Sequence, residues 1–282
     1  MKNVIYLLFS CMFFAVCNCC SKDSSQEEWD FREFREFKEF PRPTDTYDYP
    51  ILPGSDEWAQ FMTGREMKEA CQIPTEIVSK MSTQALIQSL WEHPFSPDPF
   101  FLRGEFVSDL ELCFFNNNAF VELTKRQDAG EALFERLSVC YPVTDYLPDS
   151  LITTEYIHKL IEAHFMELLM LQTVFLSQLN DNTKVNLVKI ALLNDSLKQN
   201  GAGRYRPVSW VLIGRTMVSA GYGPFIIKAV KSNEQMQYFL DGWKPYSYNG
   251  MEMRIGYYYD EFGDNAIQQD IINFGISYIN NQ

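Results

Sequence analysis

The segment that starts at Thr153 or Thr154 and runs to Leu176 constrains the fold of this chain more strongly than any other. Its apolar residues recur at helical spacing and cover much of the helix circumference: Tyr156, Ile157, Leu160, Ile161, Phe165, Leu168, Leu169, Leu171, Val174, Phe175 and Leu176. A helix that is apolar on so many sides is packed by neighbours on several faces. Because Glu155, Lys159 and Glu167 interrupt it, the segment is too polar to cross a bilayer. It therefore predicts the central helix of a helical protein.

Most of the remaining chain also shows helical spacing, interrupted by short breaks. The predicted helices are Gly64–Cys71, Thr83–Glu92, Glu105–Phe115, Ala119–Arg126, Ala129–Cys140, Val185–Leu197, Val208–Ala220, Asn233–Leu240 and Asn265–Ile279. Thr63 and Glu66 have the spacing of a capping box, which marks a helix start. Alternation with a period of two is weak and confined to Met251–Tyr257. The expected fold class is all-α.

The order of these helices suggests a repeat. They follow one another as antiparallel pairs of about forty residues, which is the length range of helical repeats. This predicts a HEAT- or armadillo-like α-α superhelix. The pairs share no clear residue-by-residue identity, so an irregular helical bundle is the alternative.

The first nineteen residues have the pattern of an export signal. Lys2 gives a positive start, and the run from Val4 to Val16 is apolar apart from Ser10. Such a run is too short for a membrane span, which needs about twenty residues. A charged start, a short apolar run and a nearby cleavage point are typical of a secretory signal peptide. We therefore predict a signal peptide over residues 1–19.

A cysteine cluster follows the apolar run at Cys17, Cys19 and Cys20. A cysteine in this place resembles the bacterial lipoprotein signal, in which the first mature residue carries lipid on its sulfur. Ser21-Lys22-Asp23 after Cys20 looks like the polar start of surface lipoproteins from the Bacteroides group. The resemblance implies lipid attachment at Cys20, with Cys17 and Cys19 as alternatives, and a location at the outer membrane or cell surface. Ordinary secretion is the other interpretation of the segment.

Residues 20–49 are predicted to be a flexible tether between the lipid and a single all-α domain over residues 50–282. Phenylalanines recur every third residue from Phe31 to Phe40, with charged residues between them. A period of three does not keep one face of an α-helix, and Pro41 and Pro43 stop helix formation. The alternative is that these rings lie in the lipid headgroup layer or on a partner.

Three stretches of the body carry a second resemblance. They are Tyr49-Pro50-Ile51-Leu52-Pro53-Gly54, Glu69-Ala70-Cys71-Gln72-Ile73-Pro74 and Met81-Ser82-Thr83. Together they are similar to a set of uncharacterised secreted proteins of gut Bacteroides, over about half of the chain. This resemblance implies no activity.

The charge of the chain argues against nucleic acid as a partner. There are 24 basic and 37 acidic residues, and removing Lys2 with the signal leaves 23 against 37, a net of −14. Such a surface repels phosphate backbones, and no basic stripe offsets it.

The body of the chain contains three widely spaced cysteines, Cys71, Cys113 and Cys140. Because their number is odd, we expect buried thiols rather than a disulfide framework or a zinc site. One disulfide with a leftover thiol is the alternative.

No motif in the sequence predicts a metal or cofactor. Glu155 and His158 match the Glu-x-x-His of di-iron bundles, but those sites need a second such pair and two further glutamates. The acids around Gly263 are interrupted by Phe262, unlike a calcium loop. The zinc-protease, Walker and serine-hydrolase motifs are absent from the sequence. We therefore expect no cofactor and no enzyme activity.

The best candidate for a binding site is an aromatic segment near the C-terminus. Its residues are Trp243, Tyr246, Tyr248, Tyr257, Tyr258 and Tyr259. Sugar rings stack on aromatic faces, and Tyr and Trp lead protein binding hot spots. The structural alternative is that these rings cap the last helix pair. We predict a non-catalytic binding or scaffold module for a glycan or protein, with a glycan-acting hydrolase that uses a carboxylate pair as the rival.

Overall fold

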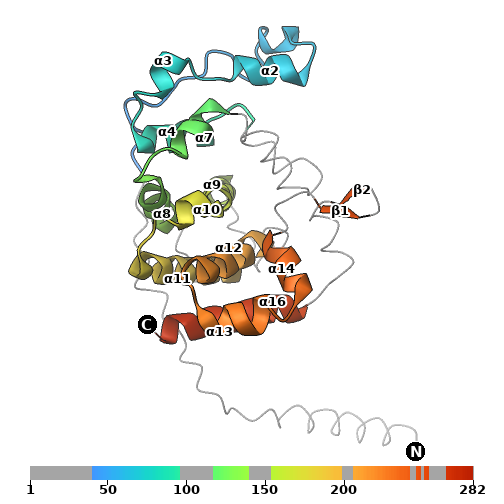
Figure 1. Ribbon diagram of the computed structural model, residues 1–282. Coiled ribbons are helices and arrows are strands. Elements are labelled where there is room, and N and C mark those ends of the chain that lie inside the picture. The colour runs from blue at the N-terminus through green and yellow to red at the C-terminus, as the bar shows by residue number, and fades with distance from the viewer. Residues whose placement is uncertain are drawn as a thin grey trace, which may run out of the picture. The chain divides into compact units, whose positions relative to one another are not determined.

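Helices make up nearly all of the regular structure in the computed structural model (Figure 1). The structure describes residues 40–95, 117–139, 154–198, 206–241, 246–248, 251–253 and 265–281. All of these belong to one compact unit, residues 36–282. The predicted all-α class is confirmed. No helix among the described residues has both the length and the apolar character needed to cross a membrane.

The first group of helices is short. It comprises the 3-10 turn η2 (Trp58–Gln60), α2 (Gly64–Ala70), α3 (Thr75–Val78), α4 (Thr83–Trp91) and α7 (Asn118–Leu123). The predicted capping box at the start of α2 is present, since Thr63 and Glu66 satisfy each other's backbone N–H groups. The Ser82 hydroxyl accepts from the Ala85 N–H and caps α4. Helices α4 and α7 carry most of the buried residues of this group, and α4 packs against α7 and against the following helix α8.

The central helices are α8 (Ala129–Val139), α9 (Thr154–Met170) and α10 (Thr173–Leu176). Every residue from Glu162 to Leu171 is buried, which confirms the interpretation of this segment as a central helix. The single helix expected through Leu176 is wrong in one respect: Gln172 is extended (φ −69°, ψ 128°) and separates α9 from α10. Its backbone change lets α10 turn back onto α8.

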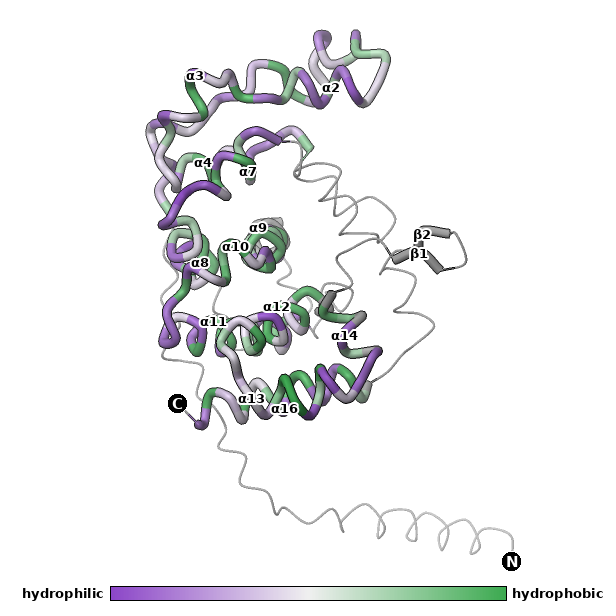
Figure 2. Tube along the Cα trace, in the orientation of Figure 1, coloured by the Kyte–Doolittle hydropathy of each residue, from purple (hydrophilic) through white to green (hydrophobic). Residues whose placement is uncertain are grey.

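The C-terminal group is built on the pair α11 (Asp181–Lys198) and α12 (Arg206–Ser219). It continues with α13 (Gly223–Phe225), the π-helical segment η5 (Ile226–Val230), α14 (Glu234–Asp241) and α16 (Asn265–Asn280). Helix α12 packs against α9, α11, α14 and α16. Figure 2 shows hydrophobic residues recurring along α12 and α16, and Ile271 and Tyr278 of α16 are buried.

A small hairpin is the exception to the helical structure. Strands β1 (Tyr246–Tyr248) and β2 (Met251–Met253) pair in antiparallel register, with Tyr246 opposite Met253 and Tyr248 opposite Met251. β2 falls in the stretch where the sequence showed weak alternation. The arrangement of the helices as a HEAT- or armadillo-like superhelix stays a prediction, as does its alternative, an irregular helical bundle.

Candidate functional site

Residues 40–49, which we call the strap, lie against α4 rather than hanging from the body as a tether. Asp45 accepts hydrogen bonds from the backbone N–H and the hydroxyl of Ser82, at 2.6 and 3.1 Å. The Tyr47 N–H donates to the Ser89 hydroxyl at 2.9 Å, and the Tyr49 hydroxyl donates to the Ser89 carbonyl at 3.1 Å. Residues 40–49, the last part of the predicted tether, therefore contact the folded body, while residues 20–39 of that tether lie outside the described residues.

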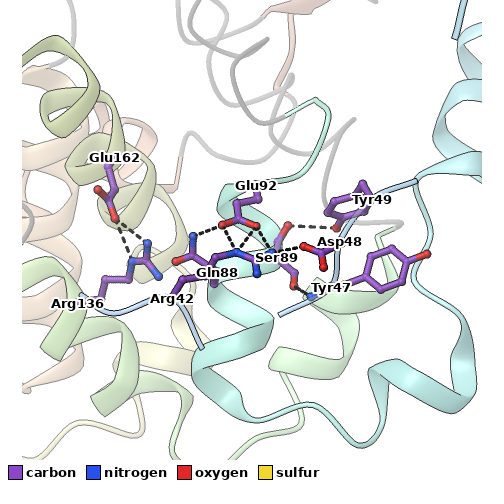
Figure 3. Close-up of polar contacts among 9 residues, drawn as sticks. All are labelled: Arg42, Tyr47, Asp48, Tyr49, Gln88, Ser89, Glu92, Arg136 and Glu162. Carbon is purple, nitrogen blue, oxygen red and sulfur yellow. Dashed lines mark hydrogen bonds and ion pairs between the residues drawn. The ribbon is translucent and has the colours of Figure 1, made fainter. Parts of the chain in front are cut away.

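An arginine fork ties the strap to the end of α4 (Figure 3). Arg42 donates from Nε and Nη2 to the Glu92 carboxylate at 2.8 and 2.9 Å, and from Nη2 to Asp48 at 2.6 Å. Gln88 donates to the same Glu92 carboxylate, which holds it in place. The hydrogen bonds that Arg42 donates to Glu92 raise the pKa of Arg42 above its usual range, so the guanidinium stays charged. Because the Arg42 side chain is 42% exposed, the pair positions the strap more than it stabilises the fold.

The first residue of the strap covers a buried ion pair between α8 and α9. Arg136 donates from Nε and Nη2 to one carboxylate oxygen of Glu162, at 3.1 and 2.7 Å (Figure 3). The Arg136 side chain is 3% exposed. Its guanidinium carbon lies 5.4 Å from the centroid of the Phe40 ring, within the range of a cation–π contact. Phe40 therefore connects the strap to the packing of the two central helices.

An aromatic cluster forms at the other end of the strap. The Tyr49 ring meets Tyr47 edge-on at 5.0 Å and His93 at 5.3 Å, and His93 lies 5.8 Å from Phe95. Burial raises the pKa of Tyr49 and lowers the pKa of His93 to about 4. The imidazole is therefore neutral at pH 7 and belongs to the packed surface under the strap.

The depressed pKa of His93 predicts acid-sensitive stability. The folded state holds this side chain neutral down to about pH 4, whereas the unfolded chain takes up a proton near pH 6.5. Stability from His93 is complete above pH 6.5 and is lost as pH falls toward 4, by up to about 3 kcal/mol. Urea unfolding measured between pH 7 and 4 should show this slope. The variant His93→Gln should have a flatter profile over that window, and an unchanged slope would contradict the assignment.

A second polar cluster lies at the junction of α9, α11 and α12. Glu167, Asn194, Lys198 and Ser209, here called the buried cluster, each have 0% exposure. Glu167 accepts from Asn194 at 2.8 Å and from the Ser209 hydroxyl at 2.9 Å, and it forms an ion pair with Lys198. Lys198 also donates to the Ser209 hydroxyl at 2.9 Å. Burial lowers the pKa of Lys198, against the opposing effect of Glu167.

The buried cluster contains a serine beside a lysine, a pairing that some acyl-transfer enzymes use. Here Lys198 donates to the Ser209 oxygen, and the Ser209 hydroxyl in turn donates to Glu167. The serine proton is therefore directed at a carboxylate, and none of the four side chains reaches solvent. The arrangement pairs the buried charges with each other and with the Asn194 amide N–H and the Ser209 hydroxyl, although Asn194 Oδ1 accepts no hydrogen bond from the described residues. These contacts fix the three helices against one another.

The residues predicted as functional lie mostly outside the described residues. These are Cys17, Cys19 and Cys20 of the lipid signal, and Trp243, Tyr257, Tyr258 and Tyr259 of the aromatic segment. Tyr246 and Tyr248 belong to β1, where the backbone pairing with β2 is described. Cys71 is a buried free thiol, as expected, and burial raises its pKa to about 11. Among the described residues, no group of three or more His, Cys, Asp or Glu side chains could hold a metal ion.

Sequence reasoning missed the strap and the buried cluster. Tyr47 and Tyr49 alternate with polar residues directly before Pro50, which is a weak sign of an extended segment in contact with the body. Nothing in the sequence indicates that Glu167 and Lys198 are buried, because polar residues on a helix usually face water.

Comparison with known proteins assigns no family to this chain: no family model, no curated protein and no solved structure matches it.

Proposed function

We propose that this chain is exported, anchored in the cell envelope by lipid on Cys20, and used there as a non-catalytic binding or scaffold module. The anchor is supported by the apolar run and the cysteine cluster at the N-terminus. The scaffold role is supported by the strap, which joins the chain leaving the tether directly to α4 and α8. A body held at a fixed attachment point can present one face to a ligand.

The strap also shortens the tether. The 19 residues from 21 to 39 lie between Cys20 and the strap. Fully extended, they reach roughly 65 Å at 3.3–3.6 Å per residue. The body therefore works within that distance of the bilayer, close enough for ligands at the cell surface.

Three ion pairs, in the strap, between α8 and α9 and in the buried cluster, support a structural role for these charged side chains. Arg136 is paired with Glu162, Lys198 with Glu167 and Arg42 with Glu92. Each pair joins two separate segments of the chain. The ligand, a glycan or a protein, is proposed to bind the aromatic segment around the β1–β2 hairpin, where Tyr and Trp supply large rigid surfaces.

Replacing Cys20 by alanine should move the protein from the membrane fraction to the soluble fraction and abolish labelling with a fatty acid. A myristoyl-length chain binds only weakly, so firm anchoring needs more than one acyl chain on the same residue. Cys71→Ala is the matched control, because Cys71 is a buried thiol in the body. Retention and labelling of the Cys20→Ala variant would transfer the anchor to Cys17 or Cys19. An intact Met1 in the natural protein would refute export.

The binding role is tested on glycan and protein arrays with residues 36–282. A ligand of the aromatic segment should lose at least about tenfold in affinity when Trp243 or Tyr258 is replaced by alanine, as expected for hot-spot rings. Tyr222→Ala, outside the segment, is the comparison variant. A ligand whose binding is unaffected by both replacements would place the site elsewhere on the body.

A further inference from the structure

The strap is connected to the core by an arm that is itself hardly packed. None of the 70 − 49 = 21 residues from 50 to 70 is buried, and the next buried residue is Cys71. The hydrogen bonds of this arm stay within residues 50–72, for the part of the chain that the structure describes. A ring contact of Trp58 with Phe95, at 5.4 Å, joins the arm to the core. Such a segment opens at low cost.

The strap contrasts with the arm because its contacts are specific and distant in sequence. Its partners Ser82, Ser89 and Glu92 lie 37 to 50 residues further along the chain. Tyr49 and Thr46 of the strap are buried. None of these contacts depends on the strap belonging to the same copy of the protein. A second copy presents an identical surface.

The arm also exposes apolar side chains that the monomer leaves uncovered. Met62 is 86% exposed and Leu52 is 52% exposed. The rings of Trp58 and Phe61 meet edge-on at 5.9 Å and are only half-buried. Two arms that cross between two copies would bring these side chains together across a two-fold axis and remove them from water.

We propose that two copies of this chain exchange straps, each placing residues 40–49 on α4 and α8 of the other. The exchanged dimer keeps every contact between strap and body. It adds the contact between the two arms, whose exposed apolar residues favour it over the monomer. With the 7 residues of α2 kept helical, the other residues of the arm, 50–63, span roughly 45–50 Å when extended, so the arm can reach a neighbouring body. The exchange does not depend on lipid at Cys20.

Charge reversal at the arginine fork tests this directly. Arg42→Glu and Glu92→Arg each place like charges together within one chain, so each variant alone loses the pair. In an exchanged dimer of one Arg42→Glu copy and one Glu92→Arg copy, both interfaces again join opposite charges. Full-length chains with two different affinity tags are co-expressed, and recovery of the second tag is measured after purification on the first.

The mixed variants should co-purify at least about tenfold more than two copies of Arg42→Glu, because only exchange between the two different variants replaces like charges with opposite ones. Two copies of the double variant Arg42→Glu/Glu92→Arg should co-purify like the wild type, because their pairs are restored. Equal recovery from the mixed pair and from the Arg42→Glu pair would overturn the proposal.

Disulfide trapping gives a second test that leaves the fork intact. One tagged copy carries Asp45→Cys and the other carries Ser82→Cys, replacing two side chains that hydrogen-bond to each other. Oxidation should join the two tags covalently if straps are exchanged. Ala59→Cys on the arm, combined with Ser82→Cys, is the control for chance collisions. Yields no higher than this control would refute exchange.

Discussion

Replacing Lys198 by methionine is expected to lower the free energy of unfolding by about 3–5 kcal/mol. The replacement leaves Glu167 charged, fully buried and without its ammonium partner, while Asn194 and Ser209 still donate to it. Two hydrogen bonds offset only part of the cost of holding a carboxylate out of water. Urea unfolding followed by circular dichroism measures the change.

Two further variants identify the cause of that loss. The double variant Lys198→Met/Glu167→Gln removes both charges and should recover most of the stability, because a buried pair replaced as a unit is often neutral. Lys80→Met, at an exposed lysine, should change stability by no more than about 0.5 kcal/mol. A single Lys198→Met variant as stable as the wild type would show that no buried ion pair forms.

Replacing Arg136 by methionine is expected to cost about 3–5 kcal/mol as well, since it strands the Glu162 carboxylate between α8 and α9. This variant should have a second effect that Lys198→Met lacks. Arg136 is the group under the Phe40 ring, so its loss should loosen the strap. Limited proteolysis should cut within residues 40–49 faster than in the wild type.

The control for Arg136 is an arginine in a surface pair. Arg65 pairs with Glu69 one helical turn away, with its side chain 88% exposed, and Arg65→Met should change stability by less than about 0.5 kcal/mol. Phe40→Leu separates the two effects of Arg136, because it removes the ring while keeping the ion pair. It should loosen the strap with little change in global unfolding. Strap cleavage that is unchanged in both Phe40→Leu and Arg136→Met would contradict the cation–π contact.

The sequence by itself determined the class of the fold and most of its helices. Apolar spacing and capping residues are local properties, and they located α4, α11, α12 and α16 to within a few residues. The central position of α9 also followed from its composition, because a helix apolar on many sides has to be surrounded. The break between α9 and α10 at Gln172 could not be predicted from the sequence, because a glutamine is also compatible with a continuing helix.

Tertiary structure decided which polar groups are buried and what they pair with. Glu167 and Lys198 are 31 residues apart, and Arg136 and Glu162 are 26 apart, so no local spacing pairs them. The same holds for the strap, whose Arg42 meets Glu92 across 50 residues. Helix formation depends on neighbours within about one turn, whereas the burial and pairing of charges depend on which helices meet. That is why the sequence predicted a flexible tether where the folded chain places a strap on α4.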